Sequence, residues 1–156
     1  MLPIEIPGYC TLELRHLVLD YNGTLAVDGR LLDGIEAQLA ALAQTVDLHI
    51  VTGNTYGDAR ERLHGCPAEV VCLPARGQAQ IKREYVLRLG AQQVVAVGNG
   101  RNDALMLEQA ALGIAVVGTE GLAGDALKAA DVVVHHATDA LGLLLHPKRL
   151  IATLRS

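Results

Sequence analysis

The chain has 156 residues, a formal net charge of -4 and 51% hydrophobic residues, and it contains neither Phe nor Trp. Its core must therefore be built from Leu, Val, Ile and Ala, which is typical of a parallel sheet flanked by helices. The acidic charge without a basic patch argues against nucleic-acid binding, and the lack of a membrane-length apolar run or a signal peptide favours a cytoplasmic protein that does not engage a membrane.

Two alternating apolar and polar segments surround Pro7-Gly8 near the start of the chain, a pattern typical of a small hairpin. Apolar runs of strand length then alternate with helical patterns. The expected core strands cover residues 16–20, 46–52, 69–73, 94–97, 113–117 and 132–134. The expected helices begin after Asp33, a predicted N-cap, and continue with 58–63, 78–89, 104–111, 122–129 and 139–155, broken at Pro147. This alternation predicts one α/β domain over residues 1–156, a single doubly wound, Rossmann-like parallel sheet flanked by helices.

The first core strand ends at Asp20, and a glycine-centred turn follows. In an open α/β sheet the carboxyl ends of the strands form the ligand-binding edge, so Asp20 is a candidate reactive group. The segment from Leu17 to Leu25 resembles the first motif of the haloacid dehalogenase (HAD) superfamily, three hydrophobic residues followed by Asp-x-Asp-Gly-Thr-Leu. A turn signal at residues 27–30 predicts a small flap over this site.

Three further positions match the HAD pattern in order and spacing over nearly the whole chain. Thr52 follows the second core strand, Lys82 lies on the helix before the fourth, and Asn102-Asp103 follow that fourth strand. Taken singly, Thr52 could equally be a helix N-cap, Lys82 a solvated charge and Asp103 a partner of the helix dipole. Their joint arrangement favours the functional interpretation, because all three are expected at one edge of the sheet.

The resemblance implies a Mg²⁺-dependent phosphoryl-transfer enzyme that acts on a small phosphorylated substrate. Asp20 would be the nucleophile and form an aspartyl phosphate, and Lys82 would offset the negative charge. The implied catalytic positions are Asp20, Asn22, Thr52 and Lys82, of which Thr52 would hold a phosphate oxygen. The implied substrate-binding positions are Gly23, Thr24, Gly53, Asn54 and Asn102. The implied metal-binding positions are Asp20, Asn22 through its main-chain carbonyl, Asn99 and Asp103.

Two amides replace carboxylates of the HAD pattern, at Asn22 and Asn99. An amide has no proton-transfer pKa near neutrality, so Asn22 cannot act as general acid and base, a loss of roughly 10²–10⁴-fold. Hydrolysis is therefore expected to be weak or narrow, with acyl phosphates and anhydrides less affected than esters. Because Asn99 removes a charge, we also expect Mg²⁺ to bind weakly, with a millimolar midpoint. A phosphate- or nucleotide-binding module without turnover remains the alternative hypothesis.

The segments Thr52-Gly53-Asn54 and Gly98 to Asp103 resemble the corresponding motifs of P-type ATPases. The chain is similar in this respect to small soluble P-type-ATPase-like hydrolases. Because its sequence contains no membrane-spanning segment, it is not expected to be a pump. The gaps from Asp20 to Thr52 and from Thr52 to Lys82 are too short for a cap domain. Capless relatives often form tetramers, so a homo-oligomer is expected to help cover the site.

Several other polar residues have no assigned chemistry. His135-His136 and His146 lack a third ligand at suitable spacing, so a structural role is favoured over metal binding. Cys10, Cys66 and Cys72 are interpreted as reduced structural thiols. Tyr21 follows the candidate nucleophile and is expected to shape the substrate entrance.

Overall fold

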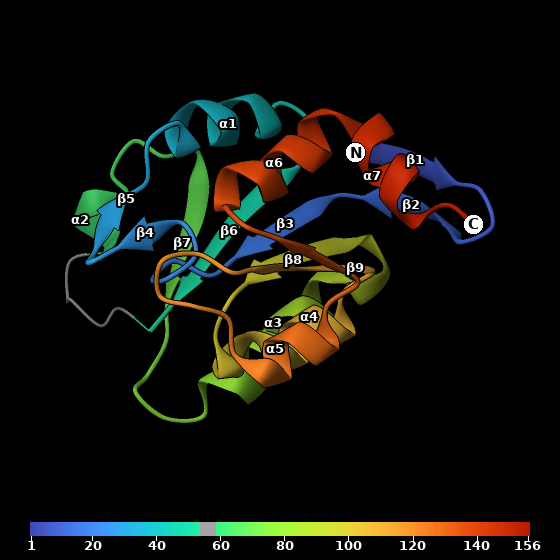
Figure 1. The fold of residues 1–156 in the computed structure, drawn as a ribbon. Coiled ribbons are helices and arrows are strands. Elements are labelled where there is room, and N and C mark those ends of the chain that lie inside the picture. The colour runs from blue at the N-terminus through green and yellow to red at the C-terminus, as the bar shows by residue number, and fades with distance from the viewer. Residues whose placement is uncertain (54–58) are drawn as a thin grey trace.

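A computed structural model describes residues 1–53 and 59–156 of the chain. Its centre is a parallel six-stranded sheet in the order β10-β9-β8-β3-β6-β7 (Figure 1). The strands are β3 (His16–Leu19), β6 (Asp47–Thr52), β7 (Ala68–Cys72), β8 (Val94–Gly98), β9 (Leu112–Val116) and β10 (Val132–Val134). From β3 the chain first runs outward to β7 and then returns to the other side of β3 at β8. This confirms the doubly wound parallel sheet that the sequence predicts.

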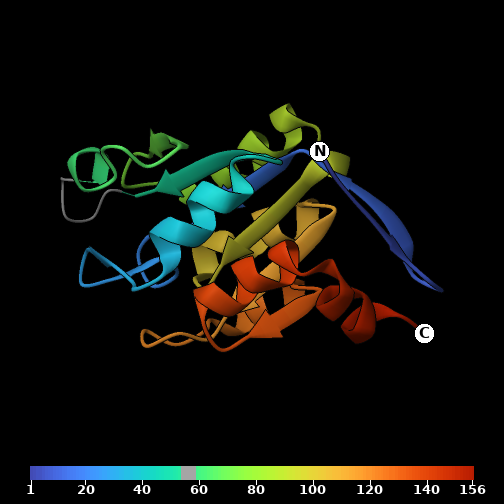
Figure 2. The ribbon, with the colours of Figure 1, turned by 90° about the horizontal axis from the view of Figure 1, so that it is seen from above.

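Helices cover both faces of the sheet (Figures 1 and 2). One layer contains α1 (Ile35–Leu42), α6 (Ala137–Leu145) and α7 (Pro147–Leu154), and the other contains α3 (Gln78–Leu89), α4 (Ala104–Gln109) and α5 (Gly124–Ala129). Side chains along β3 alternate between the two layers: Leu17 and Leu19 join the first apolar core, and Val18 joins the second. This period of two explains why β3 reads as a continuous apolar run, since both of its faces are buried.

Two antiparallel hairpins flank the sheet. The predicted N-terminal hairpin is formed by β1 (Leu2–Ile6) and β2 (Cys10–Leu14), which packs its buried face against α7. The predicted flap is formed by β4 (Ala26–Val27) and β5 (Arg30–Leu31). Asp28 and Gly29 both have positive φ at its turn, as a tight hairpin requires.

Tyr21 anchors this flap. Its side chain is only 2% exposed, and its hydroxyl donates a hydrogen bond of 3.2 Å to the carbonyl of Gly29. The Tyr21 ring is thus buried, and any effect that it has on the substrate entrance would act through the position of the flap.

Helix boundaries differ from the expected ones at a few ends. Asp33 is not an N-cap: Gly34 occupies that position with a φ of 82°, and no side chain caps the helix. The helix expected over 58–63 is present as α2 (Ala59–Arg62), and residue 58 lies outside the described residues. Two short 3₁₀ turns, η1 (Ala91–Gln93) and η2 (Arg101–Asp103), precede β8 and α4. The last helical region begins at Ala137 and restarts at Pro147, where proline is well suited to the first helical position.

The parts between the motifs leave no room for a cap domain. In the described residues, only the flap, α1 and β6 lie between Asp20 and Thr52, and only α2, β7 and the first turn of α3 lie between Thr52 and Lys82. None of the helices described is both long and apolar enough to cross a membrane.

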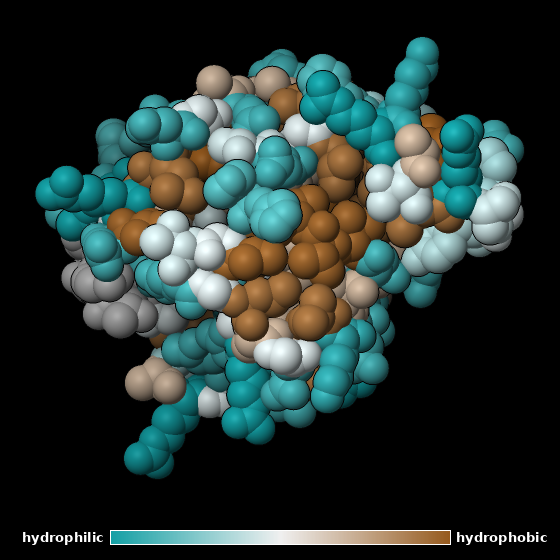
Figure 3. Space-filling model, in the orientation of Figure 1, coloured by the Kyte–Doolittle hydropathy of each residue, from teal (hydrophilic) through white to brown (hydrophobic). Residues whose placement is uncertain are grey.

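An apolar patch lies on the face shown in Figure 3, over the β10 edge of the sheet and the adjoining helix α6. Val133, in the middle of β10, is 43% exposed. Polar side chains surround this patch (Figure 3).

The buried His49 and the half-buried His16 form a pair near the amino ends of β6 and β3, at the edge of the sheet opposite Asp20. His49 Nε2 lies 3.2 Å from His16 Nδ1, and His49 Nδ1 lies 2.9 Å from the hydroxyl of Tyr85. Burial, reinforced by the neighbouring His16, lowers the pKa of His49 below its usual value. The folded protein therefore binds this proton less readily than the unfolded chain does.

We predict that His49 makes the stability depend on pH. Because its pKa is lowered on folding, its contribution is present above the unfolded pKa of about 6.5 and is lost as the pH falls below it. His49→Gln should therefore destabilise the protein most at pH 8 and progressively less towards pH 5. Urea unfolding at both pH values measures this difference, with the exposed His146→Gln as the control. A penalty that is the same at pH 5 and pH 8 would contradict the prediction.

Candidate functional site

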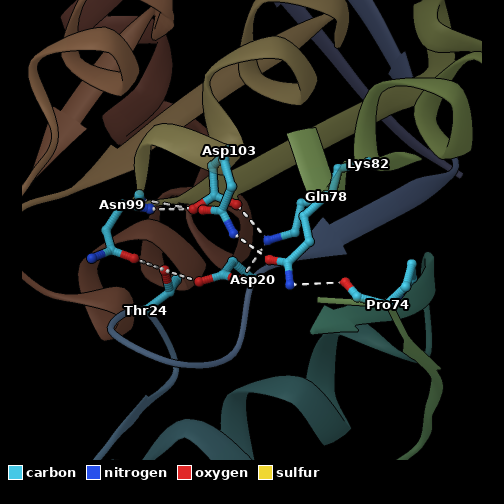
Figure 4. Close-up of polar contacts among 9 residues, drawn as sticks. Asp20, Thr24, Pro74, Gln78, Lys82, Asn99 and Asp103 are labelled. Carbon is cyan, nitrogen blue, oxygen red and sulfur yellow. Dashed lines mark hydrogen bonds and ion pairs between the residues drawn. The ribbon is translucent and has the colours of Figure 1, made fainter. Parts of the chain in front are cut away.

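The candidate site lies at the carboxyl ends of β3 and β8, where the strand order reverses. Open α/β sheets bind ligands at this switch point, because the loops leaving the two strands diverge and open a crevice. Asp20 follows β3, and Asn99 follows β8 (Figure 4). The structure thus brings together residues that are far apart in the sequence.

Lys82 joins the two carboxylates of the site (Figure 4). Its Nζ atom lies 2.6 Å from Asp20 Oδ1 and 2.6 Å from Asp103 Oδ1, and the side chain is 0% exposed. It extends from α3, whose expected bounds of 78–89 are confirmed. One ammonium facing two carboxylates leaves this trio with a net charge of about -1 when all are ionised.

This arrangement raises two pKa values, which favours the charged form of Lys82 and the neutral form of Asp20. Burial opposes a charge on Lys82, but the adjacent Asp20 and Asp103 carboxylates outweigh it and raise its pKa. Burial and the negative charge of Asp103 raise the pKa of Asp20 to about 6, although Lys82 partly opposes the shift. A carboxylate that is held ionised only near neutrality by one lysine is typical of a functional site rather than of a structural ion pair.

Asp103 also folds the loop that follows β8. Its Oδ2 atom accepts hydrogen bonds from the backbone N–H groups of Asn99, at 3.0 Å, and Gly100, at 2.8 Å. A Cβ atom on Gly98 would lie 2.5 Å from Asp103 Cγ, so only glycine allows this close approach. Both oxygens of Asp103 therefore contact donors of the protein itself.

Thr24 faces two acceptors with a single proton. Its Oγ1 atom lies 3.3 Å from Asp20 Oδ2 and 3.1 Å from Asn99 Oδ1. A hydroxyl has one hydrogen to donate, so only one of these two oxygens can receive it.

The oxygen atoms at this edge fit a hard divalent cation such as Mg²⁺, which prefers carboxylate and carbonyl ligands. Besides Asp20 and Asn99, the buried Oδ1 atom of Asn22 has no hydrogen-bond partner among the residues that the structure describes. No three His, Cys, Asp or Glu side chains are grouped to hold a metal ion anywhere in residues 1–53 and 59–156. A cation here would therefore depend on amide and main-chain oxygens as well as on carboxylates.

The expected phosphate-binding residues lie one strand away. Thr52 ends β6, which pairs directly with β3, and Gly53 follows it at the same edge of the sheet. Gly23 and Thr24 form the turn that follows Asp20, and Asn102 lies on η2. Asn54 lies outside the described residues.

Gln78, which the sequence reasoning missed, links three of these loops (Figure 4). Its Nε2 atom donates to the carbonyl of Pro74 at 3.1 Å, and its Oε1 atom accepts from Asn102 Nδ2 at 2.9 Å. A Cβ atom on Gly53 would lie 2.6 Å from Gln78 Nε2. Gln78 could have been found from the sequence, because a residue four positions before Lys82 lies on the same side of the helix.

The remaining polar candidates do not join the site. His135 and His136 are exposed where β10 leads into α6, and their rings are 6.4 Å apart. His146 is exposed between α6 and α7.

Sequence relatives include one small protein and one large one, and no family model matches the chain. The chain is 47% identical over 64 residues, 41% of its length, to the uncharacterized protein MJ0073 of Methanocaldococcus jannaschii, and covers 69% of that protein. The two proteins therefore belong to one family. It is also 34% identical over 95 residues, 56% of its length, to the phospholipid-transporting ATPase tat-1 of Caenorhabditis elegans, but it spans only 8% of that protein.

Solved structures identify the fold. A 3-deoxy-D-manno-octulosonate 8-phosphate phosphatase from Moraxella catarrhalis, solved with magnesium, phosphate and KDO, superposes with a TM-score of 0.70 at 16% identity. The match covers 92% of this chain and 94% of the phosphatase. Other matching structures are hydrolases of the HAD superfamily, so the fold expected from the motifs is confirmed.

We predict that Lys82→Met destabilises the protein by about 3–5 kcal/mol, because it leaves two carboxylates facing each other without a cation. Without the ammonium the pKa of Asp20 rises further. The loss should therefore be greatest at pH 8, where Asp20 is ionised, and smaller at pH 5, where it can take up a proton. Urea unfolding at the two pH values tests this, with the exposed Lys128→Met as the matched control. Equal losses for the two lysine variants would refute the prediction.

Proposed function

Because the chain has the HAD fold, we propose that it is a phosphoryl-transfer enzyme in which the Asp20 carboxylate attacks phosphorus. The observation that carries this proposal is the bridge from Lys82 to Asp20 and Asp103 at the switch point of the sheet. Lys82 engages Asp20 Oδ1, while Oδ2 faces the Thr24 hydroxyl. Both oxygens of the buried Asp20 carboxylate thus face donors of the protein.

In the first step, an Asp20 oxygen would form a bond to phosphorus while the bond to the leaving group breaks. The leaving group departs with the electron pair, and the product is an aspartyl phosphate on Asp20. In the second step, water would attack this phosphorus and release phosphate, which restores the carboxylate. The net reaction is hydrolysis of the phosphorylated substrate.

Positive charge is what this step needs, since the transferred group carries negative charge on its three outer oxygens. Lys82 supplies one buried positive charge beside Asp20. When bound, Mg²⁺ would neutralise further charge on the phosphoryl oxygens, held by Asp20, Asn99, the Asn22 main-chain carbonyl and Asp103. Thr52 and Gly53 would bind a phosphate oxygen, and Gln78 would keep the Gly53 and Asn102 loops in place.

The substrate we propose is a small molecule with a phosphoryl group on a good leaving group. Asn22 cannot donate a proton to an alkoxide, whereas a carboxylate or phosphate leaving group departs without one. The flap of β4 and β5 is small, and the described residues include no cap to select a particular substrate. Acyl phosphates and anhydrides therefore fit this site better than esters do.

We also propose that the chain self-associates as a homo-oligomer through the β10 edge. The exposed Val133 and the apolar patch on this face support a second copy as the partner, because an unpaired edge strand offers free backbone groups (Figure 3). Sedimentation velocity should show a species larger than the monomer, and Val133→Lys should shift it to the monomer. A monomer at micromolar concentration in the unmodified protein would overturn this assignment.

We predict that the protein with Mg²⁺ hydrolyses acetyl phosphate, and that Asp20→Asn abolishes this activity while the exposed Asp33→Asn retains it. Asn22→Asp should raise the hydrolysis of para-nitrophenyl phosphate by about 10²-fold or more, since it restores a proton donor. Phosphate release assays measure both effects.

The outcomes separate the proposal from a binding module. Turnover that survives Asp20→Asn would exclude the aspartyl phosphate. Phosphate binding without turnover of acetyl phosphate, ATP or para-nitrophenyl phosphate would indicate a module that has lost its chemistry.

A further inference from the structure

The side-chain amide of Gln78 lies between two loops of the site and carries one hydrogen that the described residues leave unused. Gln78 is the first residue of α3, one turn before Lys82, and both side chains extend from this helix to the region of the Asp20 carboxylate (Figure 4). A glutamine amide has one oxygen and two N–H groups. The contacts described above account for the oxygen and for one of the N–H groups.

These contacts determine which end of the Gln78 amide is nitrogen. The carbonyl of Pro74 can only accept a hydrogen bond, so the atom that lies 3.1 Å from it must be Nε2. Oε1 then faces Asn102, whose Nδ2 atom donates to it at 2.9 Å. Reversing the amide would break both hydrogen bonds. The second N–H of Nε2 has no acceptor in residues 1–53 and 59–156.

Gly53 shows where this nitrogen lies. A Cβ atom on Gly53 would lie 2.6 Å from Gln78 Nε2 and 3.1 Å from both Oε1 and Cδ of the same amide. The φ angle of Gly53 lies outside the left-handed region, so its backbone conformation does not require glycine. The close approach of the Gln78 amide does require it, because any side chain at this position would occupy the space of Nε2. The nitrogen is therefore packed against the backbone that follows Thr52.

A phosphoryl group beside Asp20 would need donors at this place. The Lys82 ammonium already contacts the carboxylates of Asp20 and Asp103, which leaves the three groups with a net charge of about -1 when all are ionised. A phosphoryl group adds negative charge, so each further N–H directed at its oxygens stabilises it. An amide supplies such a donor without adding another buried charge. The unused N–H of Gln78 suits this task.

We propose that Gln78 is a phosphate-binding residue, and that the second N–H of its Nε2 atom donates to the phosphoryl oxygen that Thr52 and Gly53 would bind. The hydrogen bonds to Pro74 and Asn102 stay in place and hold the amide in position before the ligand arrives. The inference rests on the proposed function in taking a phosphoryl group as the ligand. Its test measures the binding of inorganic phosphate, which requires no turnover.

The direct test is NMR spectroscopy of the ¹⁵N-labelled full chain with MgCl₂, titrated with inorganic phosphate. The two side-chain N–H signals of Gln78 are identified by sequential assignment. One of them should move downfield as phosphate binds, because a hydrogen bond to an anionic oxygen is strong. The signal of the N–H that donates to Pro74 should stay close to its original position. An amide that only holds the loops together would show neither signal moving in this way.

Calorimetric titration with inorganic phosphate and MgCl₂ measures the energetic effect. Gln78→Glu retains an oxygen for Asn102 but loses the N–H, and it should weaken binding about tenfold or more, as the loss of a hydrogen bond to a charged group does. Gln78→Met removes the N–H without adding a charge and should also weaken binding. The matched control is Gln92→Glu at an exposed position on η1, which should bind within about twofold of the unmodified protein, since salt screens a distant charge.

Gln78 signals that stay in place when phosphate binds, or a binding midpoint that neither Gln78 variant changes, would overturn the inference. An unmodified protein that binds no phosphate would overturn it as well. The proposed function survives these results if acetyl phosphate hydrolysis still depends on Asp20. Conversely, phosphate binding that depends on Gln78 in a protein without turnover would sustain the inference and remove the proposed function.

Discussion

The contact between Lys82 and the two carboxylates of Asp20 and Asp103 determines the rest of the site. It places a positive charge in a position with no access to water, where only the two anions make its burial tolerable. Asp103 in turn fixes the loop after β8 through the N–H groups of Asn99 and Gly100. One buried ammonium therefore holds α3, the end of β3 and the β8 loop in register.

Two amides, Asn22 and Asn99, lie at the site where the HAD pattern has carboxylates. Asn99 still faces Thr24 as an acceptor, and Asn22 remains in the turn beside Asp20. What the chain loses is a proton donor and one negative charge. The narrow range of leaving groups and the weak cation binding that we propose for this site follow from these two amides.

The strands and most helices could be predicted because β3, β8 and β9 are buried on both faces and α3 ends at a glycine, Gly90. The position of Lys82 in the site could be predicted from its spacing relative to the other residues of the HAD pattern. The contact of Asn99 with the Gly121 carbonyl could not be predicted, because it depends on how the loop after β9 folds back over Gly23, which no local pattern encodes. The prediction that Asp33 is the N-cap was wrong. Its side chain suits that position, but the helix starts one residue later, after Gly34 with its left-handed backbone.

The central position of β3 also has a consequence for how the protein is made. His16 pairs with Asp47 on one side but with Val94 on the other, so the second neighbour of β3 is synthesised long after the strand itself. A nascent chain that has not yet reached Val94 exposes one edge of the apolar strand β3 and has no completed site. Such long-range pairing slows folding and leaves that edge open to other chains. Chaperone binding would therefore matter most for ribosome-bound chains that end before β8.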